Sequence, residues 1–579
     1  MALIKDKDIP LTGIPSKPRV LGILPSPPPS VQETSDHDHP EKTRKSWQFV
    51  LALVSLCLIA FASSFDGSTI NVALPRITHE LNAADKYIWI ANCFVLSQTV
   101  IQPPLAQLCN IFGRRSPVIA AVAIFALGSG IAGGSTTAGG LIAGRTIQGL
   151  GSGGILLLCE LIICDMVPLR ERGKYVGIVL SSIAVGSMVG PVVGGALVQV
   201  NWRWIFYLNL PISGVVLVVM IFCLPLRYTK EPTWGRALSR IDWTGNFIFI
   251  GSICAFLLGL VFGGEVFPWS SWRVILPIVI GAFGWAGFHL YEHSCKEPIV
   301  PSRLFGNRTS VAGFFMIFLS SMLVQWVNFF WPLYFLAVRG TSPLRAGINT
   351  LPYLAFLILG ASVAGVLLTK FGVYHPMHLV GFCLSLIGPG LNLLLSESTS
   401  TAEWVVFQMV DAIGRALLFP TLLPAILASL AESDVATATG MYSFLRSFGF
   451  VWGFTIPGII FNTAFDHNSP QISDVAVRKA LANGHAYELA TGPFINSLSP
   501  SLHEEVVGVY VKALKAVWEG AIAFGVLGLF AVFVEKHVPL RTELETQYGL
   551  QEKKAPEDRE KGNCNMNAET TVEQRKESS

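Results

Sequence analysis

Charged residues are scarce in this chain. Asp, Glu, Lys and Arg make up 14% of its 579 residues, whereas hydrophobic residues make up 51%. A water-soluble protein of this size needs much more polar surface, so the composition argues against a soluble enzyme. The formal net charge is only +3 and is not gathered in one basic patch, so nucleic acid is not an expected partner.

The patterns that signal metals, disulfides and nucleotides are also missing. The ten cysteines fall mostly inside apolar runs and show no C-x-x-C spacing, which argues against a zinc site or a disulfide framework. His37 and His39 belong to a solvated charge run rather than a metal site. Because no G-x-x-x-x-G-K-[ST] loop occurs, we expect neither ATP coupling nor a cofactor. Any work must come from an ion gradient or from the solute itself.

Long apolar runs are what the chain has in abundance. A bilayer core about 30 Å thick needs roughly 20 apolar residues of helix, and about fourteen runs of that kind occur. Their approximate limits are 47–70, 86–107, 117–134, 138–164, 174–199, 204–226, 240–262, 274–292, 311–338, 346–369, 376–395, 403–430, 437–464 and 508–534. The sequence therefore predicts an all-α protein embedded in a lipid bilayer.

The distribution of Lys and Arg predicts the orientation. With a cytoplasmic N-terminus, the inner loops carry roughly twice as many cations as the outer loops, as the positive-inside rule requires. An even number of spans then places both termini in the cytoplasm. The one N-x-[ST] sequon, at Asn307, would also face the cytoplasm, so no glycosylation is expected.

An internal repeat predicts how the spans are grouped. The segment GVLLTKFGVYHP (365–376) echoes AQLCNIFGRRSP (106–117), with Gly372 matching Gly113. The two segments lie eight spans apart, which is the spacing of two six-helix halves separated by two inserted helices. The predicted parts are a disordered tail 1–46, a six-helix bundle 47–226, a linker with two inserted helices 227–310, a second six-helix bundle 311–535 with an outer loop 465–507, and a disordered tail 536–579.

A stripe of glycines marks the fifth span. Gly186, Gly190 and Gly194 recur every fourth residue, beside Pro191 and Gly195, so one helix face has almost no side chains and can pack closely on a neighbour. Structural packing alone would explain the spacing. The segment GSMVGPVVGGAL (186–197), however, resembles motif C of antiporters in the major facilitator superfamily.

Further segments carry the same resemblance, in the expected order. AGRTIQGLGSGG (143–154) resembles motif B, AQLCNIFGRRSP resembles motif A, and FDGSTINVALP (65–75) resembles the motif of the 14-span drug:proton antiporters. WRWIFYLNLP (202–211) and CDMVPLRERGKY (164–175) are similar to fungal members of that group. The resemblance covers nearly the whole membrane portion, residues 47–535.

The resemblance implies proton-coupled export of small, largely apolar molecules by alternating access, in a protein that is not an enzyme. In fungi such multidrug pumps expel drugs, toxins or self-made secondary metabolites. A monomer in the plasma membrane is expected, with a vacuolar or vesicular membrane as the alternative. Uptake by a 14-span iron-siderophore symporter is a second hypothesis, and a membrane-embedded transferase is a distant third because no span carries a metal-binding or nucleophilic cluster.

The motif A segment departs from its pattern at two places. Ala106 replaces the usual first glycine, and Asn110 replaces the usual aspartate, so charge would hold the inner gate less tightly. Gly113, Arg114 and Arg115 are retained. The resemblance assigns conformational gating to this segment and to the glycines and Pro191 of the fifth span.

Charged residues inside spans are functional candidates because each costs at least about 2.5 kcal/mol at mid-membrane unless it has a partner. Asp66 and Arg145 lie at roughly matching depths, and Asp66 is the first candidate for the proton-carrying carboxylate, with capping of a helix end near Pro75 as the alternative. The resemblance adds Arg145 to the proton relay. Glu160 is a further candidate, but about 22 Å of helix separates it from Arg145.

The second half offers candidates for the substrate cavity. Asp411 and Arg415 are four residues apart and can form either an ion pair within one helix or a substrate contact. Arg446 has no partner nearby in sequence and could meet Asp411 or an anionic substrate. Trp326 and Phe330 could line a cavity for flat apolar solutes, although lipid-facing or packing roles are commoner for such aromatics.

Overall fold

A computed structural model of the protein describes residues 47–81, 83, 86–223, 234–264, 267–482, 485–490 and 492–542. The predicted disordered tail 1–46 lies outside the described residues, as do 543–579 of the second tail and 224–233, where the predicted first bundle ends and the linker begins. The described part is built from α-helices and short 3-10 turns and contains no β-strand. This confirms the predicted all-α class.

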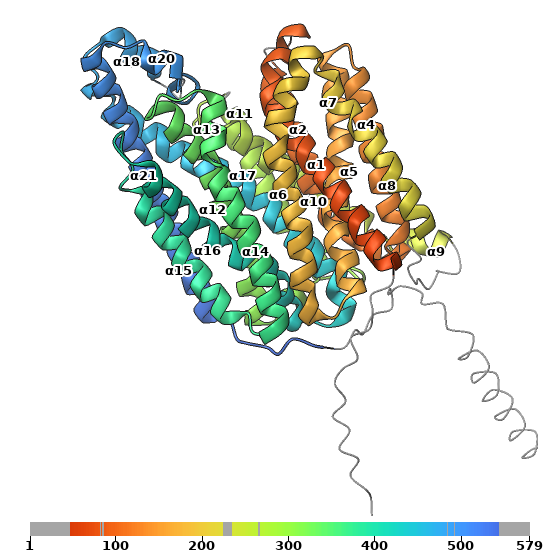
Figure 1. The fold of residues 1–579 in the computed structure, drawn as a ribbon. Helices are drawn as coiled ribbons and strands as arrows, with labels where there is room; N and C mark the ends of the chain where they lie inside the picture. The colour runs from red at the N-terminus through yellow and green to blue at the C-terminus, as the bar shows by residue number, and fades with distance from the viewer. Residues whose placement is uncertain are drawn as a thin grey trace, which may run out of the picture. The chain divides into compact units, whose positions relative to one another are not determined.

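The long helices follow the predicted apolar runs (Figure 1). They are α1 (Trp47–Glu80), α2 (Tyr87–Val100), α3 (Gln102–Phe112), α4 (Arg115–Gly134), α5 (Ala138–Met166), α6 (Leu169–Val200), α7 (Arg203–Tyr207), α8 (Asn209–Cys223), α10 (Trp243–Phe262), α11 (Trp272–Glu292), α12 (Arg308–Ala337), α14 (Leu351–Phe371), α15 (His375–Asn392), α16 (Thr401–Ala428), α17 (Val435–Asn468) and α21 (Pro500–Val534). The short helices are α9 (Trp234–Ser239), α13 (Pro343–Asn349), α18 (Val475–Leu481), α19 (His485–Glu488) and α20 (Gly492–Asn496).

Within the described residues, 12 helical segments are long and apolar enough to cross a membrane. The two other predicted spans are also helical: one is split into α2 and α3 near Ile101, and the other is α15. The total of fourteen spans therefore stays a prediction. We call the end of the bundle where α1 begins and α21 ends the inner end, after the predicted cytoplasmic side, and the opposite end the outer end.

The internal repeat has a structural counterpart. Gly113 ends α3 with φ 75°, and Gly372 ends α14 with φ 69°. Glycine adopts a positive φ at no steric cost, so in each half it allows the chain to turn at the inner end. Only Gly372 is in the left-handed helical conformation, since ψ is 13° there and −175° at Gly113. The next helix begins within three residues in both cases, at Arg115 and at His375.

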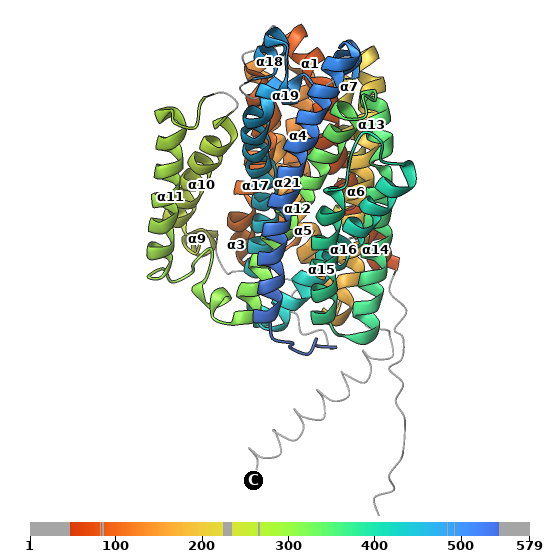
Figure 2. The same ribbon diagram turned by 90° about the vertical axis from the view of Figure 1, so that its left-hand side faces the viewer.

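The polar contacts that join the first and second halves gather at the inner end. Arg172 pairs with Glu432 at 2.8 Å, and Arg170 donates to the Thr369 carbonyl at 2.8 Å. Deeper in the bundle, the Gln102 side chain donates to Ser447 at 3.2 Å. Figure 1 shows the ribbons of the two halves meeting at the inner end and diverging toward the outer end. The inserted helices α10 and α11 stand at one side, with α10 packed on α2 and α17 (Figure 2).

Two predicted irregular segments are corrected by the structure. The segment 465–507 is mostly helical rather than a loop: α17 extends to Asn468, α18, α19 and α20 follow, and α21 begins at Pro500. The start of the predicted disordered tail is fixed to the bundle, since Val538 donates its N–H to Tyr374 at 2.6 Å and Arg541 pairs with Glu432 at 3.3 Å. Contacts with neighbouring helices hold both segments in place: Tyr510 of α21 donates to the Ala486 carbonyl, and Tyr374 accepts from Val538. Such contacts satisfy backbone groups that would otherwise lack a partner.

The glycine stripe of α6 packs on α1. A Cβ atom at Gly186 would lie 2.6 Å from the Phe61 carbonyl oxygen, and one at Gly190 would lie 2.9 Å from the Phe65 carbonyl oxygen. Thr69 also donates to the Gly190 carbonyl at 3.1 Å across this contact. The α6 glycines therefore lie directly against the backbone of α1 and its small Ser68 and Thr69 side chains, which fits the prediction of close packing.

We expect Gly190→Ala to destabilise the protein by about 1–3 kcal/mol, because the added methyl group overpacks the α1–α6 contact. The control is Gly130→Ala on α4, where the nearest atom to an added Cβ would be 3.9 Å away. Thermal unfolding in detergent measures both effects. Equal melting temperatures for the two variants would contradict the tight contact.

Candidate functional site

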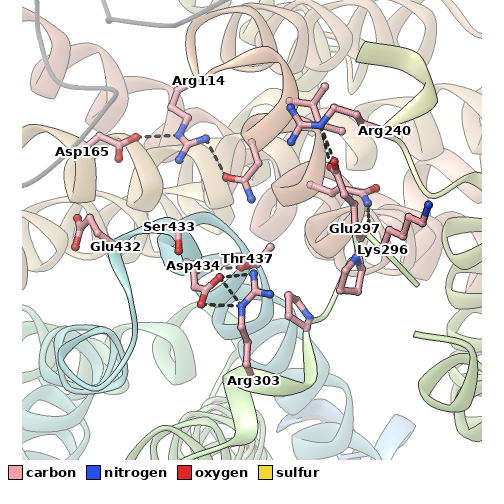
Figure 3. A pocket seen from close by; sticks show the side chains of 15 residues that line it. Arg114, Asp165, Arg240, Lys296, Glu297, Arg303, Glu432, Ser433, Asp434 and Thr437 are labelled. Carbon is pink, nitrogen blue, oxygen red and sulfur yellow. Dashed lines mark hydrogen bonds and ion pairs between the residues drawn. The ribbon is translucent and has the colours of Figure 1, made fainter. Parts of the chain in front are cut away.

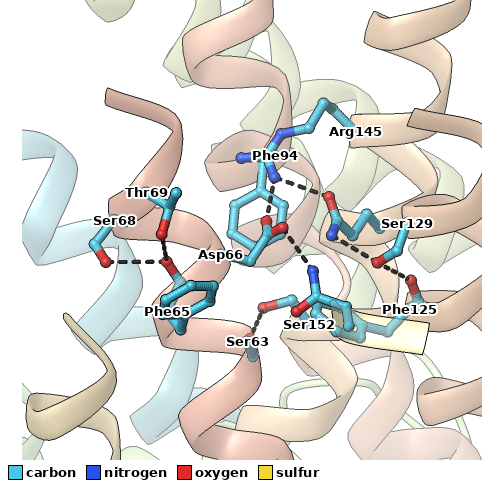
Figure 4. Close-up of polar contacts among 12 residues, drawn as sticks. Ser63, Phe65, Asp66, Ser68, Thr69, Phe94, Phe125, Ser129, Arg145 and Ser152 are labelled. Atoms are coloured by element: carbon cyan, nitrogen blue, oxygen red, sulfur yellow. Dashed lines mark hydrogen bonds and ion pairs between the residues drawn. The ribbon is translucent and has the colours of Figure 1, made fainter. Parts of the chain in front are cut away.

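The most deeply buried ion pair of the first half joins Asp66 on α1 to Arg145 on α5 (Figure 4). Both side chains are fully buried. The second carboxylate oxygen of Asp66 accepts a hydrogen bond from the Asn209 amide of α8 at 2.8 Å. Both oxygens thus have a donor, which is what a charged carboxylate needs in a low-dielectric interior. The depths estimated from the sequence for Asp66 and Arg145 agree with this contact.

The arginine is held by a second set of contacts. Its guanidinium donates to Gln148 at 2.8 Å, and Gln148 in turn donates to Ser129 of α4 at 2.8 Å. The guanidinium carbon also lies 4.3 Å from the centroid of the Phe94 ring on α2. The pair is therefore positioned by several helices of the first half at once. A change in the charge of Asp66 would therefore alter contacts with all of these helices.

The local structure of α1 settles the alternative role of Asp66. The helix runs without interruption past Asp66 and Pro75 to Glu80, so Asp66 lies in the helix interior and does not cap its end. Sequence reasoning missed Asn209 and Gln148, although both lie inside motifs that carried the family resemblance. Their proximity to Asp66 is a tertiary property, because they belong to three different helices.

A second buried ion pair connects the two halves. Glu160, near the inner end of α5, pairs with Arg446 of α17, and its other carboxylate oxygen accepts a hydrogen bond from Ser443 at 2.7 Å. Glu160 is 1% exposed and Arg446 is 4% exposed. The suggestion that Arg446 meets Asp411 is wrong, because α17 faces α5 at this depth. The two halves cannot separate here without breaking this pair.

Asp411 and Arg415 form the ion pair within α16 that their spacing allows, at 3.0 Å. Both are fully buried, and several of their polar atoms, Asp411 Oδ2 and Arg415 Nε and Nη1, have no hydrogen-bond partner. Gly388 of α15 lies directly against Asp411. The pair sits inside the second half. Its role in binding substrate stays a prediction.

Trp326 and Phe330 on α12 lie in the apolar core of the second half. Trp326 donates its ring N–H to the Val517 carbonyl of α21 at 3.2 Å, and Phe330 packs against Phe461 with ring centroids 5.8 Å apart. Both residues are fully buried. In this structure they pack between helices, and a substrate contact for either stays a prediction.

The motif A residues surround Arg114 at the inner end. Arg114 is 3% exposed and pairs with Asp165 of α5 at 3.0 Å. It also donates to the Cys109 carbonyl at 2.5 Å and to the Asn110 side chain at 3.3 Å. The carboxylate missing at position 110 is thus supplied to Arg114 from another helix. Asp165 escaped sequence reasoning even though it lies in the quoted CDMVPLRERGKY segment.

The remaining predicted gating residues are dispersed. Arg115 donates to the Ile221 carbonyl of α8 at 2.5 Å, at the inner edge of the first half. Gly194 faces Thr69 of α1, whereas Pro191 is exposed and Gly195 is half-buried on α6. The glycines at every fourth position form the close contact with α1.

A polar cavity of about 630 Å³ lies at the inner end beside Arg114 (Figure 3). Its charged lining residues are Arg114, Asp165, Arg240, Lys296, Glu297, Arg303, Glu432 and Asp434. They come from both halves and from the linker. Hydrogen bonds from Arg303 to the Asp434 carboxylate, the shortest 2.7 Å long, raise the pKa of Arg303 above its usual value. Opposite charges balance in this cavity, as expected of a seam that must close and open.

We expect Asp165→Asn to destabilise the protein by about 1.5–3 kcal/mol, because the buried guanidinium of Arg114 loses the charged carboxylate that accepts its Nε–H. The matched control is Glu297→Gln, whose partner Arg240 is 34% exposed at its side chain. Loss of such an exposed pair costs about 0–1 kcal/mol. Thermal unfolding in detergent compares the two variants. If Asp165→Asn behaves like the control, the buried Arg114–Asp165 pair does not stabilise this seam.

These features define a class before any comparison: a helical membrane transporter with two halves closed at one end and ion pairs buried at membrane depth. The sequence pattern of the Major Facilitator Superfamily matches residues 56–291. The chain is 48% identical to the MFS efflux transporter aclA of Aspergillus oryzae, over 91% of this chain and 96% of that protein. It is 43% identical to the efflux pump FUS6 of Gibberella moniliformis, over 92% and 95% of the two chains. The protein belongs to the major facilitator superfamily.

Solved structures agree on the fold. The human organic anion transporter MFSD10 (TETRAN) superposes with a TM-score of 0.55 at 13% identity, over 84% of this chain and 100% of that chain. The proton:xylose symporter XylE superposes with a TM-score of 0.51 at 15% identity, over 83% and 94% of the two chains. At these identities the two superpositions show the fold, and the relatives confirm the family resemblance drawn from the motifs.

Proposed function

We propose that the protein is a proton-coupled efflux transporter that exports small, largely apolar molecules by alternating access. The observation that carries the proposal is the fully buried Asp66–Arg145 pair. Among the described residues of the first half, it is the one ion pair between different helices at this depth. A buried carboxylate that is neutralised by a movable arginine can exchange that partner for a proton.

The mechanism follows from what each state stabilises. A proton that enters from the outer side neutralises Asp66, so Arg145 loses its charged partner and the contacts to Asn209 and Gln148 rearrange. The protonated protein then favours opening at the inner end. Release of the proton to the cytoplasm and binding of the solute restore the pair and favour the outward-facing state. The inner end is closed in the present structure, which corresponds to that outward-facing state.

The α1–α6 contact connects this chemistry to movement. Asp66 lies on α1 between Phe65 and Ser68, which both face Gly190 of α6. A shift of Asp66 therefore moves the helix that packs on the glycine stripe. Smooth glycine faces allow helices to slide at low cost. The same helices thus carry the proton site and the moving surface.

The relatives support the direction of transport and the kind of solute. Names such as efflux transporter and efflux pump recur among proteins 42–48% identical to this chain, and one is the MFS-type transporter of the acurin A biosynthesis cluster of Aspergillus aculeatus. We therefore propose toxins or self-made secondary metabolites as solutes. We place the protein as a monomer in the plasma membrane with both termini cytoplasmic, and the proton gradient as its energy source.

The test is efflux of a panel of labelled apolar compounds from cells that express the protein, with and without a protonophore. Extrusion that depends on expression and stops with the protonophore is the expected result. Uptake instead of extrusion, or a growth advantage under iron limitation without extrusion, would overturn the efflux direction. Extrusion that is insensitive to the protonophore would overturn the proton coupling.

A further inference from the structure

Three aromatic rings of α12, α17 and α19 meet toward the outer end. Phe329 of α12 stacks on Tyr487 of α19 with ring centroids 4.5 Å apart and 6° between the planes. Phe454 of α17 meets Phe329 edge-on, also at 4.5 Å. Unlike the fully buried Trp326 and Phe330, these rings are accessible: Phe329 and Phe454 are half-buried, and Tyr487 is 36% exposed.

The space beside these rings is open. Gly458 lies one helical turn outward from Phe454 on the same face of α17, and an added Cβ there would meet no atom within 4 Å. Asn328, the neighbour of Phe329, is exposed although it lies inside a membrane span, about 14 Å from the outer end of α12. Polar side chains inside a span mostly face the bundle interior or a water-filled cavity rather than lipid.

The segment that supplies Tyr487 is fixed on the second half. Tyr510 of α21 donates to the Ala486 carbonyl at 2.5 Å, and Asn496 donates to the Gly340 carbonyl at 3.0 Å. Ala486 and Ala490 are buried on either side of Tyr487. The ring is therefore held over α12 by a packed segment, so binding against it loses little conformational entropy.

We propose that Phe329, Phe454 and Tyr487 form an outer binding site for flat, uncharged aromatic solutes. The proposal rests on the proposed efflux function and assigns this site to a solute that has left the centre of the transporter on its way out. The rings supply stacking and edge contacts, and the Asn328 amide can both donate to and accept from a polar group on the solute. None of these four side chains carries a charge, so the site selects against ionised solutes.

The site is tested with benzophenone, an aromatic ketone that inserts into nearby C–H bonds under ultraviolet light. The full-length protein in lipid nanodiscs is irradiated with benzophenone, with and without the flat dye Nile red as competitor, and adducts are mapped by mass spectrometry. We expect adducts at 325–329, 454–458 and 485–489 that Nile red suppresses. Adducts confined to lipid-facing residues such as Phe371, unchanged by Nile red, would overturn the site.

Variants separate ring chemistry from folding. Tyr487→Leu and Phe454→Leu should each weaken Nile red binding roughly three- to tenfold, the range expected for loss of one aromatic pair. Tyr487→Phe keeps the ring and should bind like the wild type. The control Phe530→Leu removes a 63% exposed ring of α21 that lies outside the trio, and should change nothing. Unchanged Nile red binding in both leucine variants would overturn the proposal.

Transport by the wild type separates this proposal from the proposed function. If adducts form at the three rings but the wild type extrudes no compound of the panel, the efflux function fails and the site stands. If Nile red is extruded in a protonophore-sensitive manner with the same efficiency by the wild type and both leucine variants, the function stands and the site fails.

Discussion

Asp66→Asn is expected to abolish proton-driven export. The amide keeps the shape of the side chain but cannot neutralise Arg145, which stays fully buried. Removing one partner of a buried ion pair costs about 3–5 kcal/mol, which corresponds to a shift of more than about a hundredfold between the two conformational states. We therefore expect protonophore-sensitive efflux to fall to the level of cells without the protein.

The measurement compares efflux at equal surface expression. Asp66→Glu retains the carboxylate and should restore part of the activity. Asp466→Asn, at an exposed position near the outer end of α17, is the matched control and should export like the wild type. Proton-driven export that survives in Asp66→Asn would remove Asp66 from the coupling mechanism.

Breaking the Glu160–Arg446 pair is expected to shift the transporter toward the state open at the inner end. Glu160→Gln leaves Arg446 buried with Ser443 and neutral groups, and Arg446→Gln leaves the Glu160 carboxylate buried. Either change should destabilise the closed inner end by about 3–5 kcal/mol. Because the pair links α5 to α17, this cost acts directly on the contact between the halves.

A charge exchange provides the decisive comparison. The single variants Glu160→Arg and Arg446→Glu should each lose closure of the inner end. The double variant, which restores an ion pair of reversed orientation, should recover it. Closure is read from labelling of a cysteine placed at Ala106, which faces Gly440 across the inner seam. The matched control is Asp411→Asn, which breaks an ion pair inside one half and should leave this labelling unchanged. Equal labelling of Glu160→Gln and the wild type would show that the pair does not hold the halves together.

Apolar run length and motif spacing were enough to predict most of the fold. The run 138–164 became α5, and the echo between Gly113 and Gly372 became two helix ends that are each followed by a glycine with positive φ. Such features are local: a bilayer demands a helix of a certain length, and a tight turn demands glycine. Outside the membrane these constraints are absent, which is why the segment 465–507 was expected to be a loop although it is mostly helical.

Some residues of the candidate site were recognisable from the sequence, whereas their contacts were not. Asp66, Arg145 and Glu160 were recognisable because a charge inside a span is costly wherever it occurs. Arg446 was recognisable for the same reason, but its pairing with Glu160 was not, and Asn209 gave no signal because it is an uncharged residue of a helix far from Asp66 in the chain.

The sequence by itself determined that this is a helical membrane protein, because composition and the length of apolar runs act along the chain, and its motifs carried the resemblance to the major facilitator superfamily. Only the tertiary structure decided that Arg446 pairs with Glu160 rather than Asp411, and that Tyr487 stacks on Phe329. Those contacts depend on which helix faces bring side chains together across the bundle, and no spacing along a single helix contains that information.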